Sequence, residues 1–222
     1  MNLLIFGASG MVGQGVLREC LLDAGVQRVT LIGRTRLDHH DPKLTHIVTE
    51  DVAALAPHAE ALKDATACFF CLGVSSSGLD AQTYTQITQT LTLAVATQLV
   101  ALAPQMTFIY VSGAGTDSTE QGRSHWARVK GHTENQLQKV GFARVCLFRP
   151  GVIQPLDGIT SHTRSYRWFY RAFGPVLSLA RWLLPHQVLT TRTVGRAMLN
   201  AVRGNAQGVL DSAAIARLAR AG

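Results

Sequence analysis

Residues 2–13 carry the feature that most constrains how this chain can fold. The apolar run 3–6 is typical of a strand buried on both faces of a parallel sheet. Residues 11–22 have the pattern of a helix, and the turn before and into it contains three glycines, Gly7, Gly10 and Gly13. A strand, a tight turn and a helix direct free backbone N–H groups to one point, where a diphosphate can bind. We therefore predict a dinucleotide site, with an incidental glycine turn as the alternative.

Strand and helix patterns alternate along the rest of the chain. Short apolar segments typical of buried strands recur at 28–32, 44–48, 66–72, 106–111 and 142–148. Helical patterns cover 53–63, 80–102 and 191–203, and a short edge segment at 208–210 precedes a last helix. This alternation predicts an α/β fold, a Rossmann-type doubly wound parallel sheet, in a single domain over 1–222. Within it, we expect 154–222 to supply a small, mostly helical cap on the substrate side and the C-terminal elements.

The composition fits a cytoplasmic protein that binds no metal. The chain has 222 residues, of which 47% are hydrophobic, enough to bury a full core. We expect no signal peptide and no membrane span, because no apolar stretch is long enough. Four cysteines lie in apolar surroundings, and Cys68 and Cys71 fall inside a predicted strand, where their side chains would point to opposite faces. Reduced core thiols are therefore expected, and the eight histidines form no metal pattern.

The net charge of +7 is concentrated in one segment. Between Asp157 and Asp211 there is no acidic residue but seven arginines, which predicts a surface that attracts anions. The aromatic and basic stretch 162–184 has three interpretations: a helical cap with its arginines in water, a lid over an apolar or anionic substrate, or an interfacial helix pair on an anionic membrane. The first is preferred, so peripheral membrane contact is not favoured. No motif supports nucleic-acid binding.

The residues after the second predicted strand indicate which dinucleotide binds. An acidic side chain there would accept hydrogen bonds from the ribose 2′-hydroxyl of NAD. Here the first charged residue is Arg34, with Arg36 two positions later, and a guanidinium can grip a 2′-phosphate. We therefore predict NADP as the cofactor, with NAD as the alternative; two solvated loop arginines would be the trivial explanation.

The G-x-x-G-x-x-G spacing resembles that of the short-chain dehydrogenase/reductase superfamily, particularly its atypical and extended branches, which include NAD-dependent epimerase/dehydratase-like proteins. The resemblance implies a diphosphate loop that contains Gly7, Ser9, Gly10, Met11, Val12 and Gly13. It further implies contacts to the adenine edge from Asp51 and Val52, over the adenosine ribose from Leu72, Gly73 and Val74, and beside the nicotinamide carboxamide from Pro150, Gly151 and Val152. Asp51 is also placed to cap a helix over 53–63.

The same resemblance implies the catalytic positions. Ser112 directly follows a predicted strand, where a hydroxyl of the family polarises the substrate oxygen. Lys130 matches the lysine that contacts the cofactor ribose; a surface ion pair with Glu134, on the same helix face, is the alternative explanation. The residue four positions before Lys130 is Trp126, where the family has its acid/base tyrosine. An indole N–H donates a hydrogen bond but does not titrate usefully.

Two functions follow from this pattern. The preferred one is an oxidoreductase that exchanges hydride between a nicotinamide and a carbonyl or secondary alcohol, with Ser112 and Lys130 as catalytic residues. The alternative is a non-catalytic NADP(H)-binding regulator or assembly factor. The sequence predicts neither the small-molecule substrate nor the oligomeric state.

Overall fold

The computed structural model describes residues 1–159, 187–204 and 206–221. Its strands are β1 (Asn2–Phe6), β2 (Arg28–Gly33), β3 (Leu44–Val48), β4 (Ala67–Phe70), β5 (Thr107–Val111), β6 (Arg144–Arg149), β7 (Val152–Gln154), β8 (Val188–Thr190) and β9 (Gly208–Asp211). Its helical elements are α1 (Met11–Leu22), the 3₁₀ turn η1 (Ala56–His58), α2 (Ala59–Leu62), α3 (Ala81–Thr85), the π-helical turn η2 (Gln86–Thr90), α4 (Leu91–Leu102), α5 (His125–Leu137), α7 (Thr191–Arg203) and α8 (Ser212–Leu218). The segment 160–186, which is part of the predicted cap, lies outside the described residues.

Seven strands form one parallel sheet in the order β3-β2-β1-β4-β5-β6-β9. The chain moves outward from β1 to β3 and then returns to the other side of β1 with β4, so the switch point lies between β1 and β4. In such a sheet, ligands bind beyond the carboxyl ends of the strands at that point. The predicted Rossmann-type sheet is confirmed. A separate pair of short parallel strands, β7 and β8, completes the described sheets.

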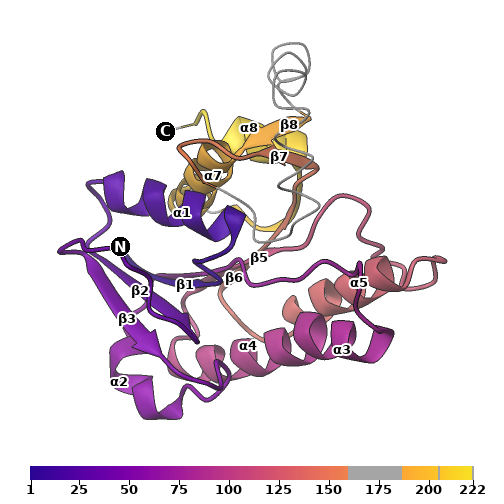
Figure 1. The fold of residues 1–222 in the computed structure, drawn as a ribbon, viewed down its shortest axis with the longest axis horizontal. Coiled ribbons are helices and arrows are strands. Elements are labelled where there is room, and N and C mark those ends of the chain that lie inside the picture. The colour runs from indigo at the N-terminus through magenta and orange to yellow at the C-terminus, as the bar shows by residue number, and fades with distance from the viewer. Residues whose placement is uncertain (160–186, 205, 222) are drawn as a thin grey trace.

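Helices cover both faces of the sheet, with α1, α7 and α8 on one side and α2, α3, α4 and α5 on the other (Figure 1). Alternate residues of β1 therefore enter two different cores: Leu3 and Ile5 pack on the side of α1 and α7, whereas Leu4 and Phe6 pack on the opposite side. Burial on both faces explains why the strands read as continuous apolar runs.

Helices α1 and α7 pack against each other through residues without bulky side chains. A Cβ at Gly15 would lie 2.5 Å from Cβ of Thr191, and one at Gly195 would lie 2.8 Å from Cγ of Glu19. The buried Glu19 carboxylate also accepts a hydrogen bond from Arg196 at 2.9 Å. The last third of the chain thus covers α1, the helix that follows the glycine turn.

Two predicted helices differ from the structure. The segment 53–63 is helical only from Ala56, and Asp51 does not cap it: its carboxylate accepts from the N–H of Ala53 at 2.9 Å in a separate turn. Leu55 is held outside the helix because its N–H donates to Gln98 at 3.0 Å. The long helix predicted over 80–102 is interrupted by the π-helical turn η2.

The other boundaries follow their capping residues. Asp80 accepts from the N–H of Thr83 at 2.8 Å at the start of α3, and Asp211 accepts from the N–H of Ala214 at 2.8 Å at the start of α8. The predicted edge segment is β9, which pairs with β6. Across the part of the chain that the structure describes, no helix is both long and apolar enough to cross a bilayer.

Candidate functional site

The turn after β1 leaves no room for side chains. Gly7 has φ of +76°, and a Cβ there would lie 2.6 Å from the backbone nitrogen of Leu72, which follows β4. A Cβ at Gly13 would lie 2.1 Å from the carbonyl oxygen of Gly7. The turn is further fixed by the N–H of Gly10, which donates to Gly7 O at 3.0 Å. Only glycine fits at these two positions, because the backbone of the turn packs directly against neighbouring backbone.

The helix that follows the turn is suited to an anion. Gly10 is its N-cap and provides no side-chain cap, and the first turn holds no acidic residue. The N–H groups of Met11, Val12 and Gly13 have no acceptor within the helix, because they precede its first full turn. Ser9 is exposed, and its carbonyl accepts from Gln14 Nε2 at 2.7 Å. The predicted diphosphate residues therefore form one cradle that fits a diphosphate.

The adenosine side is less enclosed. Arg34 directly follows β2 and is exposed, whereas Arg36 faces a different hollow of about 320 Å³ together with His39, His40 and His46. The N–H of Thr49 donates to Gly33 O at 3.0 Å, which holds the segment before Asp51 beside the end of β2. Val52 is buried and Asp51 is exposed. After β4, Leu72 is half-buried, and Gly73 and Val74 are exposed.

On the other side of the switch point, the loop after β5 is bonded to the turn after β6. The N–H of Ser112 donates to Phe148 O at 2.9 Å, and the N–H of Ala114 donates to Pro150 O at 2.8 Å. The N–H of Gly151 donates to Ser212 Oγ at 2.8 Å. These bonds occupy two of the backbone groups predicted to face a nicotinamide carboxamide, so the contacts of Pro150, Gly151 and Val152 stay predictions.

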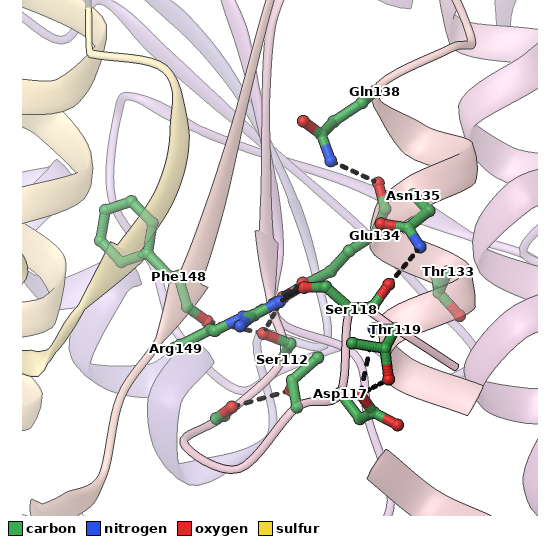
Figure 2. A network of polar contacts seen from close by, with 12 residues as sticks. Ser112, Asp117, Ser118, Thr119, Thr133, Glu134, Asn135, Gln138, Phe148 and Arg149 are labelled. Carbon is green, nitrogen blue, oxygen red and sulfur yellow. Dashed lines mark hydrogen bonds and ion pairs between the residues drawn. The ribbon is translucent and has the colours of Figure 1, made fainter. Parts of the chain in front are cut away.

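A buried carboxylate lies at the centre of this side (Figure 2). Glu134 of α5 is wholly buried and accepts from Nε of Arg149 at 3.1 Å on both oxygens and from Ser112 Oγ at 2.5 Å. Nη2 of Arg149 also contacts Glu134 and Ser118 Oγ. The alternative of a surface ion pair between Glu134 and Lys130 is therefore wrong, because Glu134 turns inward to an arginine that sequence reasoning had not paired with it.

Lys130 lies one helical turn before Glu134, and its ammonium donates a hydrogen bond to the carbonyl oxygen of Ser112. Burial lowers the pKa of Lys130 to about 8, and the negative charge of Glu134 opposes that shift. Lys130 and Ser112 are thus adjacent, as predicted. The single hydroxyl proton of Ser112 is directed to Glu134, however, so in this conformation Ser112 cannot also donate to a substrate carbonyl.

No tyrosine of the described chain takes the acid/base role. Trp126 is half-buried and packs on the loop after β5, where a Cβ at Gly115 would lie 3.2 Å from its ring. His125 turns to α3, with Nε2 3.2 Å from both Thr85 Oγ1 and Ala81 O. Tyr84 and Tyr110, the two tyrosines that the structure describes, are both 2% exposed, and burial raises the pKa of each.

The C-terminal arginines are more strongly paired than the charge count suggested. Each of the three within the described ranges contacts an acid from a distant part of the chain: Arg192 with Asp157, Arg196 with Glu19 and Arg203 with Asp23. The prediction of a free anion-attracting surface is therefore wrong for these three. The other four, and the stretch 162–184, lie outside the described residues. Among the residues placed by the structure, no group of histidine, cysteine and acidic side chains could hold a metal ion.

Sequence comparison finds similar proteins, although no protein-family model matches the chain. It is similar to protein HTATIP2 of Rattus norvegicus, with 29% identity over 212 residues, which span 95% of this chain and 84% of that protein. It is also similar to the mitochondrial protein fmp52 of Emericella nidulans, with 25% identity over 215 residues, 90% of this chain and 86% of the relative.

Solved structures share the fold at low sequence identity. The Bordetella bronchiseptica enzyme WbmF in complex with NAD+ superposes with a TM-score of 0.69 and 17% identity, covering 99% of this chain and 76% of that one. A Burkholderia thailandensis oxidoreductase of the short-chain dehydrogenase/reductase family gives a TM-score of 0.67 and 17% identity over 97% and 92% of the two chains. A UDP-glucose 4-epimerase superposes with a TM-score of 0.69 and 13% identity, covering 95% of this chain and 76% of that one. The chain therefore shares the Rossmann-type fold of these nucleotide-binding and short-chain dehydrogenase/reductase structures, and its sequence is similar to HTATIP2 and fmp52 over most of its length.

Proposed function

We propose that this protein binds NADP(H) at the carboxyl edge of its sheet. The observation that carries the proposal is the glycine cradle at the switch point, because Gly7 and Gly13 have no space for a Cβ and the first turn of α1 presents unpaired N–H groups. The solved structure of WbmF, which has the same fold, is a complex with NAD+.

The preference for NADP over NAD rests on Arg34. It is the first charged residue after β2, it is exposed, and no acidic side chain precedes it there to accept from a 2′-hydroxyl. A guanidinium at this position would pair with the 2′-phosphate that distinguishes NADP. On the nicotinamide side, Lys130 would bind the ribose hydroxyls, and the turn at Pro150 would border the ring.

A non-catalytic binding role fits the described site better than conventional turnover. The Ser112 hydroxyl is committed to Glu134, and the tyrosine position holds a tryptophan. A nicotinamide supplies a hydride donor or acceptor, but the reacting oxygen also needs a proton donor or acceptor from the chain. Beside Ser112, burial lowers the pKa of Lys130 to about 8, which is close to neutrality.

That property of Lys130 favours an oxidoreductase as the second candidate. With an ammonium that titrates close to neutral pH, the chain could give a proton to, or take one from, a carbonyl or secondary alcohol beside the nicotinamide. Catalysis of this kind would require Lys130 to exchange its contact with the Ser112 carbonyl for one with substrate.

Binding of the two coenzymes tests the first proposal. Titration calorimetry should show NADPH binding more tightly than NADH by about tenfold, the effect of one charge-assisted hydrogen bond. Arg34→Ala should abolish the difference, and Arg36→Ala, the matched control, should keep it. Equal affinities in the wild type that Arg34→Ala leaves unaltered would remove the NADP assignment. Absence of binding by either coenzyme would end the proposal itself.

Restoring the missing phenol separates the two roles. If the scaffold has only lost its acid, Trp126→Tyr should raise NADPH-dependent turnover across a panel of carbonyl compounds, whereas Trp126→Phe, which adds no titrating group, should not. A wild type and a Trp126→Tyr variant that both bind NADPH but turn over nothing would support the regulator.

The cellular compartment is a further prediction. We expect the cytoplasm from the composition, whereas the fmp52 relatives are named as mitochondrial proteins. Fractionation of cells that express the full chain with a C-terminal tag would distinguish the two locations.

A further inference from the structure

Three separate chain segments converge on the Glu134 carboxylate (Figure 2). Glu134 lies on α5, Ser112 directly follows β5, and Arg149 ends β6. Arg149 reaches further, to Ser118 in the loop between β5 and α5. One side chain thus fixes the loop after β5 and the residue that precedes the Pro150–Gly151 turn.

The carboxylate has no contact with bulk water to offset its charge. The Glu134 side chain is 1% exposed and that of Arg149 is 18% exposed. Moving such a pair out of water is costly, and buried ion pairs add little net stability compared with apolar side chains of the same size. Hydrophobic residues could therefore hold the elements together as well. What the pair adds is a fixed geometry, because a guanidinium that bonds both carboxylate oxygens has a defined orientation.

The segments that Glu134 holds belong to one side of the predicted cofactor site. The backbone bonds from Ser112 to Phe148 and from Ala114 to Pro150 join them directly. Helix α5 approaches the same loop closely, since a Cβ at Gly131 would lie 1.7 Å from Asp117 O. The diphosphate side, Gly7 to Gly13, is instead fixed by backbone packing, with Gly7 against the backbone of Leu72 and Gly13 against that of Gly7.

We propose that Glu134, acting through Arg149, is a positioning residue for the nicotinamide half of the bound dinucleotide and not for its adenosine half. The inference rests on the proposed function, because it assumes that a nicotinamide dinucleotide occupies this edge. It assigns Glu134 no contact with the ligand: Glu134 sets Arg149, and Arg149 sets the turn at Pro150 and the loop that carries Ser112.

The experiment compares two ligands that differ only in the half concerned. One is NADPH, and the other is 2′-phospho-ADP-ribose, which keeps the adenosine and diphosphate but lacks the nicotinamide ring. In Glu134→Gln, which keeps the size of the side chain but removes its charge, the affinity for NADPH should fall about tenfold, as for the loss of one well-placed hydrogen bond. The affinity for 2′-phospho-ADP-ribose should stay within about twofold of the wild type.

Two further variants distinguish a local effect on nicotinamide binding from a general loss of folding. Ser118→Ala removes only the outer contact of Arg149, from an exposed position, and should produce a smaller loss that is again confined to NADPH. Glu120→Gln is the matched control, because Glu120 lies in the same loop and pairs with His132 of α5 at 2.7 Å but touches neither Ser112 nor Arg149. It should change neither affinity.

The outcomes separate the two proposals. If the wild type binds both ligands and neither Glu134→Gln nor Ser118→Ala weakens NADPH binding selectively, the positioning role is wrong and the binding function stands. Loss of both ligands in Glu134→Gln with the NADPH-selective loss retained in Ser118→Ala supports the proposal and assigns the larger loss to partial unfolding. If the wild type binds neither ligand, the proposed function fails, and the positioning role with it. Should the coenzyme titrations favour NAD, NADH and ADP-ribose replace the two ligands in the same design.

Discussion

The two sides of the candidate site are held in shape by different interactions, backbone packing on one side and side-chain charges on the other. The diphosphate side consists of backbone, and its shape depends on missing side chains at Gly7 and Gly13. The nicotinamide side depends on charges: Glu134, Arg149 and Lys130 fix it through contacts between α5, β5 and β6. Backbone geometry is indifferent to pH and salt, whereas a buried charge network responds to the loss of any one partner. Substitutions on the diphosphate side should therefore lower stability through steric clash. Substitutions on the nicotinamide side should lower it by leaving a buried charge without its partner.

The largest expected effect comes from removing one half of the buried pair. Arg149→Met leaves the Glu134 carboxylate buried without its partner and should lower the free energy of unfolding by about 4 kcal/mol. The double variant Glu134→Gln/Arg149→Met should recover a large part of that loss, because no isolated charge remains. Urea unfolding of the wild type, both single variants and the double variant measures the coupling. Additive losses would show that the two side chains act independently.

A slightly smaller loss should follow from filling the glycine cradle. Gly13→Ala places a Cβ 2.1 Å from the Gly7 carbonyl oxygen and 2.7 Å from Ala8 Cα, both backbone atoms that cannot rotate away. We expect a loss of about 3 kcal/mol in urea unfolding, the same at all pH values at which the chain is folded. At Gly10 the nearest atom is 3.3 Å from the added Cβ, so Gly10→Ala should affect stability much less. A Gly13→Ala variant as stable as the wild type would contradict the close packing of this turn.

On the nicotinamide side, the contribution of Lys130 to the free energy of unfolding should depend on pH. Lys130 has a pKa of about 8 in the folded state against an ordinary value of 10.5, so the unfolded state binds more protons between these values. Stability due to Lys130 therefore rises with pH across that window and is lost as pH falls toward 8. The difference in unfolding free energy between the wild type and Lys130→Met should shift by roughly 2 kcal/mol in favour of the wild type as pH is raised from about 8 to 10. A difference that does not change with pH would show that the Lys130 ammonium is well solvated.

The smallest effect is expected at the edge of the same network. The hydrogen bond from His132 holds the pKa of Glu120 below its ordinary value, so its contribution is present at neutral pH and is lost as pH falls below 4.5. Both side chains are about one-third exposed, and solvent screens their attraction. Glu120→Gln should shift the urea midpoint far less than Arg149→Met does. A comparable shift in the two variants would mean that the contrast between buried and exposed pairs does not hold in this chain.

Local signals made the diphosphate side predictable. The bounds of α1 and α7 were predicted to the residue, because apolar periodicity and flanking turn residues define a helix within a short stretch of sequence. The role of Gly7 is equally local, since a strand, a glycine and a helix follow one another directly. Within the described residues, the parallel sheet and its switch point followed from the regular alternation of elements.

The partner of Glu134 could not be found in the same way. Lys130 shares a helix face with Glu134, and spacing alone favours their pairing, but Arg149 is fifteen residues away on another element. A charged residue at the end of the otherwise apolar strand 145–148 was the one available signal. The pairing of Arg192, Arg196 and Arg203 with distant acids was hidden for the same reason. Charge counts report composition, whereas partners depend on the tertiary fold.

The contact between α1 and α7 also determines when the packing around the glycine turn is completed. Glu19 and Arg196 are separated by 177 positions, so α1 is synthesised long before α7, the helix that packs against it. Contacts of such long range raise the contact order and slow folding. A nascent or truncated chain that ends before Thr191 has the whole glycine motif but lacks the layer that buries Gly15 and Glu19, which makes the far end of the polypeptide a condition for the packing of the first helix.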